Sequence, residues 1–150
     1  MKKNFLTVLG TGIGNYFGVL YPALILFIIV MFSDYISGIL VARKEAIENS
    51  DNIKYGLNSK KGILGIYKKI GYILAVFVSI CIDYMIFWFS NEIGISVKRN
   101  TLFGLLVTIW FVLNEIISIL ENIKRMGVKL PKFLMKFLNN MQKNINDKNK

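Results

Sequence analysis

Three carboxylates, Asp34, Asp83 and Glu115, stand in the chain among long runs of apolar residues. An ionisable side chain inside a lipid bilayer costs at least roughly 2.5 to 3.5 kcal/mol at the centre of a helix, so such residues usually face other protein groups or water, and they often mark proton or ion pathways. The chain has no histidine, which is the commonest general base and metal ligand, and it has only one cysteine, Cys81. We therefore expect no enzymatic activity, no metal site and no cofactor.

The stretches that contain these carboxylates have the length of a helix that crosses a bilayer. They cover residues 23–42, 70–89 and 102–120, and one crossing needs roughly 20 mainly apolar residues. The chain is 54% hydrophobic with a net charge of +10, and all its Lys and Arg residues lie outside these stretches. This segregation is typical of a multi-pass membrane protein. We therefore predict an all-α integral membrane protein, with residues 1–150 forming a single membrane domain with three transmembrane helices.

A fourth crossing is the alternative, and it depends on residues 5–20. In this shorter apolar stretch Gly10, Gly14 and Gly18 recur at every fourth position, a spacing that lets two membrane helices pack closely. Pro22 then disfavours a helix that continues into the first predicted span. We expect an interfacial or partly inserted helix that packs on a neighbour, with a true crossing as the other reading.

The basic residues predict which ends face the cytoplasm. Seven lie in the predicted loop 43–69 and eight in the tail 121–150, whereas Lys2, Lys3, Lys98 and Arg99 are the others. By the positive-inside rule the loop and the C-terminus are cytoplasmic, with three crossings or with four. The basic composition would also suit a nucleic-acid-binding protein, but here the charges flank the apolar runs instead of lining one face, so we expect no nucleic-acid partner.

The tail contains one further predicted helix, which Pro131 opens. Phe133 and Phe137 repeat at a spacing of four, with lysines on other sides, as in an amphipathic helix that lies on a membrane surface. Asn144–Lys150 are expected to be disordered. The residues expected to contact anionic phospholipid are Lys60, Lys61, Lys68, Lys69, Lys124, Arg125, Lys129, Lys132 and Lys136.

Each predicted span also carries small and polar residues that should face other helices or water. They are Asp34, Ser37 and Gly38 in the first span, Gly71, Ala75, Ser79 and Asp83 in the second, and Thr108, Asn114, Glu115 and Ser118 in the third. At 1.5 Å per residue, Asp34 and Glu115 lie about 12 and 8 Å from the cytoplasmic ends of their helices, and Asp83 about 9 Å from the opposite end. One protomer therefore should not bring all three carboxylates together. Three roles stay open: structural groups that are neutral or paired, groups that line a water-filled lumen in an oligomer, or an ion pathway.

Four strings in order resemble the bacteriophage holin family that includes the toxin-secretion holins. They are Asp34-Tyr35-Ile36-Ser37-Gly38, Ser59-Lys60-Lys61-Gly62-Ile63, the run from Asn114 to Asn122, and the run from Gly127 to Leu134. The resemblance covers roughly Leu24 to Leu138, and Asp83 stands where the family tends to end its second span with an acid.

The resemblance implies a protein of the bacterial cytoplasmic membrane that accumulates and then forms homo-oligomeric lesions. Through these lesions a separately encoded endolysin reaches the cell wall or a toxin leaves the cell, without required direct contact, and an antiholin is a further partner of this kind of protein. Two other functions stay open: a small ion channel or transporter that uses Asp34 or Glu115, and an antiholin or membrane anchor that only binds a partner.

Overall fold

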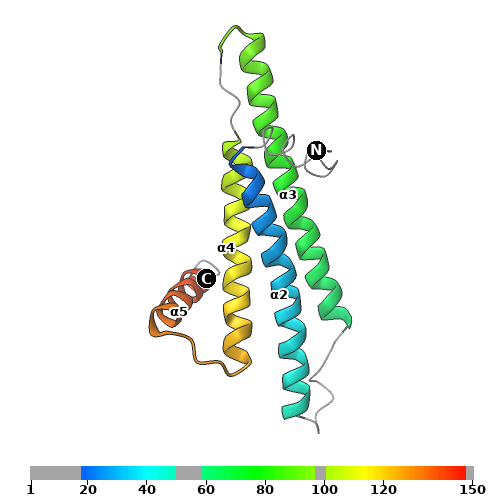
Figure 1. Ribbon diagram of the computed structural model, residues 1–150, viewed down its shortest axis with the longest axis vertical. Coiled ribbons are helices and arrows are strands. Elements are labelled where there is room, and N and C mark those ends of the chain that lie inside the picture. Colours follow the sequence, from blue (N-terminus) through cyan, green and yellow to red (C-terminus); the bar gives the residue numbers. More distant parts are fainter. Residues whose placement is uncertain (1–17, 50–58, 97–100, 148–150) are drawn as a thin grey trace, which may run out of the picture. The chain divides into compact units, whose positions relative to one another are not determined.

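A computed structural model of the chain describes residues 18–49, 59–96 and 101–147. Within these ranges all regular structure is α-helical, as Figure 1 shows. The helices are α2 (Leu20–Glu48), α3 (Ser59–Glu92), α4 (Leu102–Arg125) and α5 (Lys132–Asp147). The prediction of an all-α fold is confirmed.

Three of these helices are long and apolar enough to cross a membrane, which agrees with the predicted number of spans. The candidate spans are Leu20–Glu48, Gly62–Glu92 and Leu102–Arg125, and only 28%, 17% and 22% of their most apolar windows are buried inside the protein. Large apolar side chains such as Phe77 and Trp110 are more than half exposed. Exposed apolar surface on this scale is costly in water, at about 25 cal/mol per Å², but it is the ordinary outer surface of a protein in lipid.

The helices are longer than the predicted spans, and the predicted loop 43–69 is wrong at both of its ends. Residues 43–48 continue α2, which has 29 residues, and residues 59–69 begin α3, which has 34. At 1.5 Å per residue these helices measure about 44 and 51 Å, whereas the hydrocarbon core is about 30 Å thick. Hydropathy marks the apolar part of a helix, but the backbone hydrogen bonds of these two helices continue into polar sequence. At the end of α2, the ion pair between Lys44 and Glu48, one turn apart, supports this extension.

α2 begins at Leu20, so the helix starts before Pro22 instead of after it. Pro22 lies in the first turn, where its missing N–H group would have had no partner within the helix. The preceding break is at Gly18, which has a φ of +50° and whose carbonyl accepts a hydrogen bond from the Tyr21 N–H at 3.3 Å. Gly18 therefore lies in a turn, in a backbone conformation that favours glycine. Gly10 and Gly14, and with them the question of a fourth crossing, lie outside the described residues.

The end of the chain also differs from expectation. α5 begins directly after Pro131, whose carbonyl accepts a hydrogen bond from the Met135 N–H at 3.1 Å. It continues to Asp147, so the expected disorder from Asn144 onward is wrong for residues 144–147.

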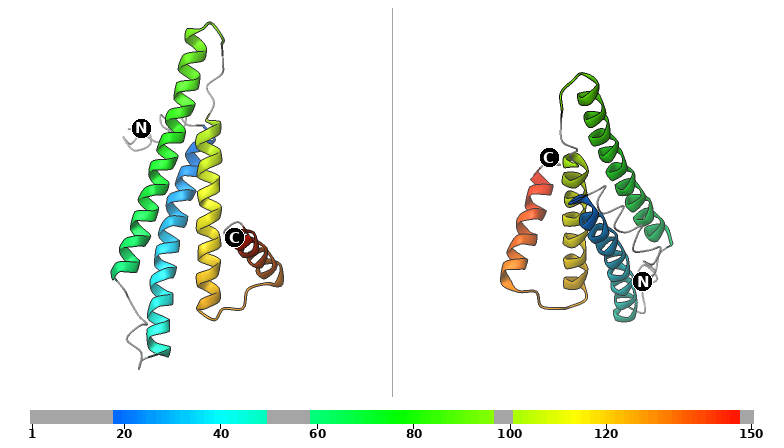
Figure 2. Two further views of the ribbon diagram at one scale, coloured as in Figure 1. Left: turned by 180° about the vertical axis from the view of Figure 1, so that it is seen from behind. Right: turned by 45° about the horizontal axis from the view of Figure 1, so that its top comes forward.

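The chain divides into two compact units, and each of the three long helices contributes to both. Unit 1 comprises Met1–Ile29 and Tyr67–Val112, and unit 2 comprises Val30–Ile66 and Leu113–Lys150. The buried apolar side chains of unit 1 are Leu20, Phe27, Val76 and Val112, and those of unit 2 are Val30, Met31, Val41 and Leu138. Figure 2 shows the same helices from two further directions.

Candidate functional site

Several polar side chains of the long helices are buried inside the protein, whereas many of their large apolar side chains are exposed. In unit 1 the buried polar residues are Ser79, Asp83 and Thr108, and in unit 2 they are Ser37, Glu115 and Asn122. This arrangement is the reverse of a soluble protein and is the one that lipid favours, because a polar group that faces hydrocarbon has no hydrogen-bond partner. These two buried clusters are the candidate functional sites.

The cluster in unit 1 is built on Asp83 of α3, whose carboxylate binds the first turn of α4. Its two oxygens accept hydrogen bonds from the backbone N–H of Phe103 at 3.0 Å and of Gly104 at 2.7 Å. The first N–H groups of a helix have no partner within the helix, and the helix dipole makes this end partly positive. Asp83 therefore acts as the N-terminal cap of a neighbouring helix. The negative charge of this carboxylate is thus stabilised by the partly positive first turn of α4 in the same protein.

Gly104 makes this close approach possible. A Cβ atom at this position would lie 3.1 to 3.2 Å from the side chains of Leu20, Ile80 and Asp83, closer than most real Cβ contacts. The carbonyl of Gly104 also accepts a hydrogen bond from the Thr108 hydroxyl at 2.6 Å. Sequence reasoning did not identify Gly104, although the one glycine within the third predicted span was an available signal.

The other residues predicted for the polar face of α3 do not all share that face. Ser79 is buried and donates to the Val76 carbonyl at 2.7 Å, but Gly71 is exposed and a Cβ there would meet no atom within 4 Å. Ala75 is half-buried. The reason is geometric: each step of four residues turns about 40° around a helix of 3.6 residues per turn, so Gly71 and Asp83 are about 120° apart.

The residues of α4 do follow one face, because they are four, seven and seven residues apart, and seven residues make almost two full turns of a helix. This face contains Gly104, Thr108, Glu115 and Asn122, all of which are buried. A row with this spacing stays nearly straight along the helix axis. Asn114 and Ser118 lie beside it and are half-buried.

The cluster in unit 2 joins α2 to the last turns of α4. The Asn122 amide donates to the Ser37 hydroxyl at 2.9 Å and, over a longer 3.4 Å, to the Asp34 carboxylate. Ser37 in turn donates to the Asp34 carbonyl at 2.9 Å. Gly38 lies beside this cluster, where an added Cβ would make only an ordinary contact, at 3.9 Å from the Asn122 amide nitrogen. The cluster therefore pairs polar groups of two helices that would otherwise face lipid.

Glu115 is also in unit 2, and it is almost completely buried, with 2% of its surface exposed. Asp83 belongs to unit 1, whereas Asp34 and Glu115 belong to unit 2. Among the described residues, no three or more His, Cys, Asp and Glu side chains form a group that could hold a metal ion. The hydrogen bonds of the two sites join α3 to α4 in unit 1 and α2 to α4 in unit 2.

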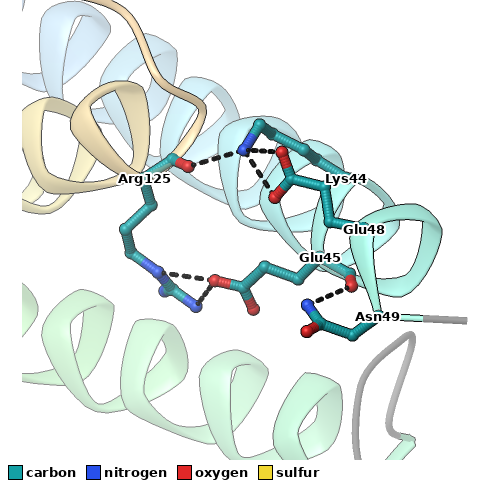
Figure 3. Close-up of polar contacts among 5 residues, drawn as sticks. All are labelled: Lys44, Glu45, Glu48, Asn49 and Arg125. Carbon is teal, nitrogen blue, oxygen red and sulfur yellow. Dashed lines mark hydrogen bonds and ion pairs between the residues drawn. The ribbon is translucent and has the colours of Figure 1, made fainter. Parts of the chain in front are cut away.

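A third polar cluster, on the surface of unit 2, joins the C-terminal ends of α2 and α4 (Figure 3). Arg125 binds one Glu45 oxygen through two of its nitrogens, at 3.1 and 2.7 Å. Lys44 pairs with Glu48 at 2.6 Å and also donates to the Arg125 carbonyl at 3.4 Å. Lys44 thus places a positive charge at the partly negative end of α4. Arg125 was also predicted to contact lipid, which stays a prediction, since its side chain remains 54% exposed while it pairs with Glu45.

Most of the other residues predicted for lipid contact are on the surface. Lys60, Lys68, Lys124, Lys129, Lys132 and Lys136 are exposed, Lys69 is half-buried, and the side chain of Lys61 lies outside the described part of the chain. The Lys68 ammonium lies 5.5 Å from the centre of the Tyr72 ring, a favourable cation–π contact. Tyr72 in turn stacks on Phe111 of α4, with 4.1 Å between ring centres.

Comparison with known proteins assigns the chain to a family. The model of the bacteriophage holin family matches residues 11–143. An uncharacterized protein of Listeria monocytogenes is 32% identical over 127 residues, which cover 82% of this chain and 76% of the relative. An uncharacterized protein of Clostridium acetobutylicum is 32% identical over 127 residues, with 84% and 86% covered. A third, from Halalkalibacterium halodurans, is 36% identical over 78 residues, about half of each chain.

No solved structure matches the chain. The family match, however, covers most of the sequence, including the three helices that are long and apolar enough to span a membrane. The resemblance found in the sequence motifs is therefore confirmed, and this chain belongs to the bacteriophage holin family.

Proposed function

We propose that this protein is a holin that oligomerises in the bacterial cytoplasmic membrane and opens lesions there. Membership of the family over residues 11–143 carries this proposal. The lesions would let a separately encoded endolysin reach the cell wall, or a toxin leave the cell, without direct contact between holin and cargo. The proposal includes a cytoplasmic C-terminus and an antiholin as a regulatory partner.

The two polar clusters support the proposal on physical grounds. In lipid, each buried charge would cost at least roughly 2.5 to 3.5 kcal/mol if it turned outward, so a single protein must keep these groups inside. Water can replace every hydrogen bond that Asp83, Ser37 and Asn122 make within the protein. The same side chains are therefore compatible with a dry helix bundle and with the wall of a water-filled lesion.

The experiment is induction of the chain in bacteria, with and without a co-expressed endolysin. We expect growth to stop abruptly, a folded cytoplasmic reporter enzyme to leave the cells, and rapid lysis only when the endolysin is present. Ion leakage without loss of the reporter enzyme would contradict the proposal and indicate a small channel. The absence of any lesion, combined with delayed lysis when a known holin is co-expressed, would indicate an antiholin.

Assembly can be tested separately by cross-linking in membranes. Ser79→Leu places bulk on a small-residue helix face that we expect to pack against other helices in the oligomer as well as in the single chain, so we expect fewer cross-linked oligomers at unchanged membrane insertion. Val78→Leu is the control, because it enlarges an apolar side chain at the neighbouring exposed position of the same helix. Equal oligomer yields for the two variants would show that the Ser79 face has no role in assembly.

A further inference from the structure

α5 presents three distinct strips along its first two turns. Residues four apart lie on the same side of a helix. Leu134 and Leu138 form an inner strip, with Leu138 only 2% exposed. Phe133 and Phe137 form a second apolar strip that is 71% and 41% exposed. Lys132 and Lys136 form a third strip beside the phenylalanines, and both are exposed. The inner strip accounts for the packing of α5 on its own unit, but it leaves two phenylalanines uncovered next to two positive charges.

The chain connection keeps this surface close to the membrane. α4 ends at Arg125, and Gly127, with a φ of +89°, turns the chain away two residues later. The Gly127 N–H donates to the Lys124 carbonyl at 3.0 Å, and the Val128 N–H donates to the Ile123 carbonyl at 3.3 Å. This pattern is a Schellman motif, which ends a helix firmly. Only residues 126–131 separate α4 from α5, and so short a segment spans at most about 20 Å. α5 therefore starts within about 20 Å of the end of a membrane-spanning helix.

We propose that α5 binds the anionic phospholipid surface of the membrane that holds the three long helices. Phe133 and Phe137 would enter the boundary between headgroups and acyl chains, and Lys132 and Lys136 would pair with lipid phosphates beside them. Lys129, exposed in the connection, adds to the same positive surface. The argument for lipid as the occupant is charge complementarity together with position, since interfacial helices combine exposed aromatic residues with lysines in this way. The inference requires insertion of the long helices but not the formation of lesions.

A spin label on the full chain can test this assignment. Asn140 lies three residues after Phe137 and is exposed, so Asn140→Cys in a Cys81→Ala background places a nitroxide near the phenylalanine strip and leaves the strip intact. The protein is reconstituted in vesicles of phosphatidylcholine alone or with one quarter phosphatidylglycerol. Collisions of the label with oxygen and with a water-soluble nickel complex report its depth. Protein orientation does not matter, because both leaflets contain the anionic lipid.

We expect the label to be inserted in the anionic vesicles and mainly aqueous in the neutral ones. Lys132→Gln combined with Lys136→Gln should lower the ratio of inserted to aqueous label about 30-fold, because each lysine near an anionic surface contributes roughly a five-fold factor. High salt should cause a similar loss without any substitution. The matched control is Lys148→Gln combined with Lys150→Gln, which removes the same charge beyond α5 and should change the ratio little.

Several results would overturn the assignment. Equal insertion of the label in both kinds of vesicle would show that lipid charge does not drive the binding of α5. Equal effects of the two double variants would show that the total positive charge of the chain, and not Lys132 and Lys136 in particular, attracts the lipid. A label that neither oxygen nor nickel reaches would show that protein covers the strip, either this chain or a second copy. Because the assay needs no lysis, a chain that binds lipid in this way but opens no lesions would keep the assignment of α5 and refute only the proposed function.

Discussion

Replacement of Asp83 by asparagine tests the most specific contact in the structure, the cap on α4. The carboxylate accepts two hydrogen bonds from backbone N–H groups, and bonds to a charged group contribute about 1.5 to 3 kcal/mol each. Asparagine has one acceptor oxygen, so one of the N–H groups of Phe103 and Gly104 loses its partner in a buried site. The favourable interaction of the charge with the helix dipole, about 0.3 to 1 kcal/mol, is lost as well. We expect Asp83→Asn to lower the free energy of unfolding by about 2 to 4 kcal/mol.

The assay is reversible unfolding of the purified protein in mixed micelles, followed by the loss of helical circular dichroism. Glu92→Gln is the matched control, since it removes the same charge from an exposed position on the same helix and should change stability by less than about 0.5 kcal/mol. Asp83→Lys should cost more than Asp83→Asn, because a cation would face the partly positive end of α4. A loss below about 0.6 kcal/mol for Asp83→Asn, the average for hydrogen bonds between membrane helices, would refute the capping argument.

Three further substitutions test the other contacts in the same unfolding assay. Gly104→Ala should lower the free energy of unfolding by about 1 to 3 kcal/mol, because the added Cβ would crowd three side chains. Gly62→Ala is the control, since a Cβ there meets no atom within 4 Å and should not destabilise the protein. Equal changes in stability for the two variants would contradict this prediction. Asn122→Leu should cost about 1 kcal/mol through its lost bonds to Ser37 and Asp34, and an unchanged stability would show that they contribute nothing. Arg125→Gln should cost less than about 1 kcal/mol, since its ion pair with Glu45 is largely exposed, and a larger loss would mean that this surface cluster is essential.

Apolar length and charge segregation were enough to predict the helical class and the number of long apolar helices. The same signals failed at helix ends, because they report the edge of the hydrocarbon and not the last hydrogen-bonded turn. The continuation of α2 to Glu48 depends on backbone hydrogen bonds and on the ion pair between Lys44 and Glu48, which hydropathy does not register. The start at Leu20 depends on the tolerance of a first helical turn for Pro22.

The polar residues were identifiable from sequence, but their partners were not. Asp83 was visible as an acid among apolar residues, and its partner is a pair of backbone N–H groups, which every residue except proline carries. Only the three-dimensional packing of α3 on α4 in unit 1 selects Phe103 and Gly104. Spacing was informative where it contained steps of seven residues, as on α4, because seven residues make almost two full turns. It was misleading where it repeated every four residues, as from Gly71 to Asp83.

If the protein is a holin, as proposed, these contacts also predict when lysis should begin. The Asp83 carboxylate accepts hydrogen bonds from two N–H groups, and water can replace both partners. Breaking these two bonds therefore costs much free energy in lipid and little at a surface in contact with water. If the closed single-chain arrangement competes with the assembled lesion, weakening the closed arrangement should advance lysis. Asp83→Asn should therefore lyse cells earlier than the unchanged chain at equal accumulation, whereas Glu92→Gln should not alter the onset. Delayed lysis with Asp83→Asn at equal accumulation would contradict this reasoning. It would mean that the contact between Asp83 and α4 persists in the lesion, and that losing this contact weakens the assembled lesion more than the closed single chain.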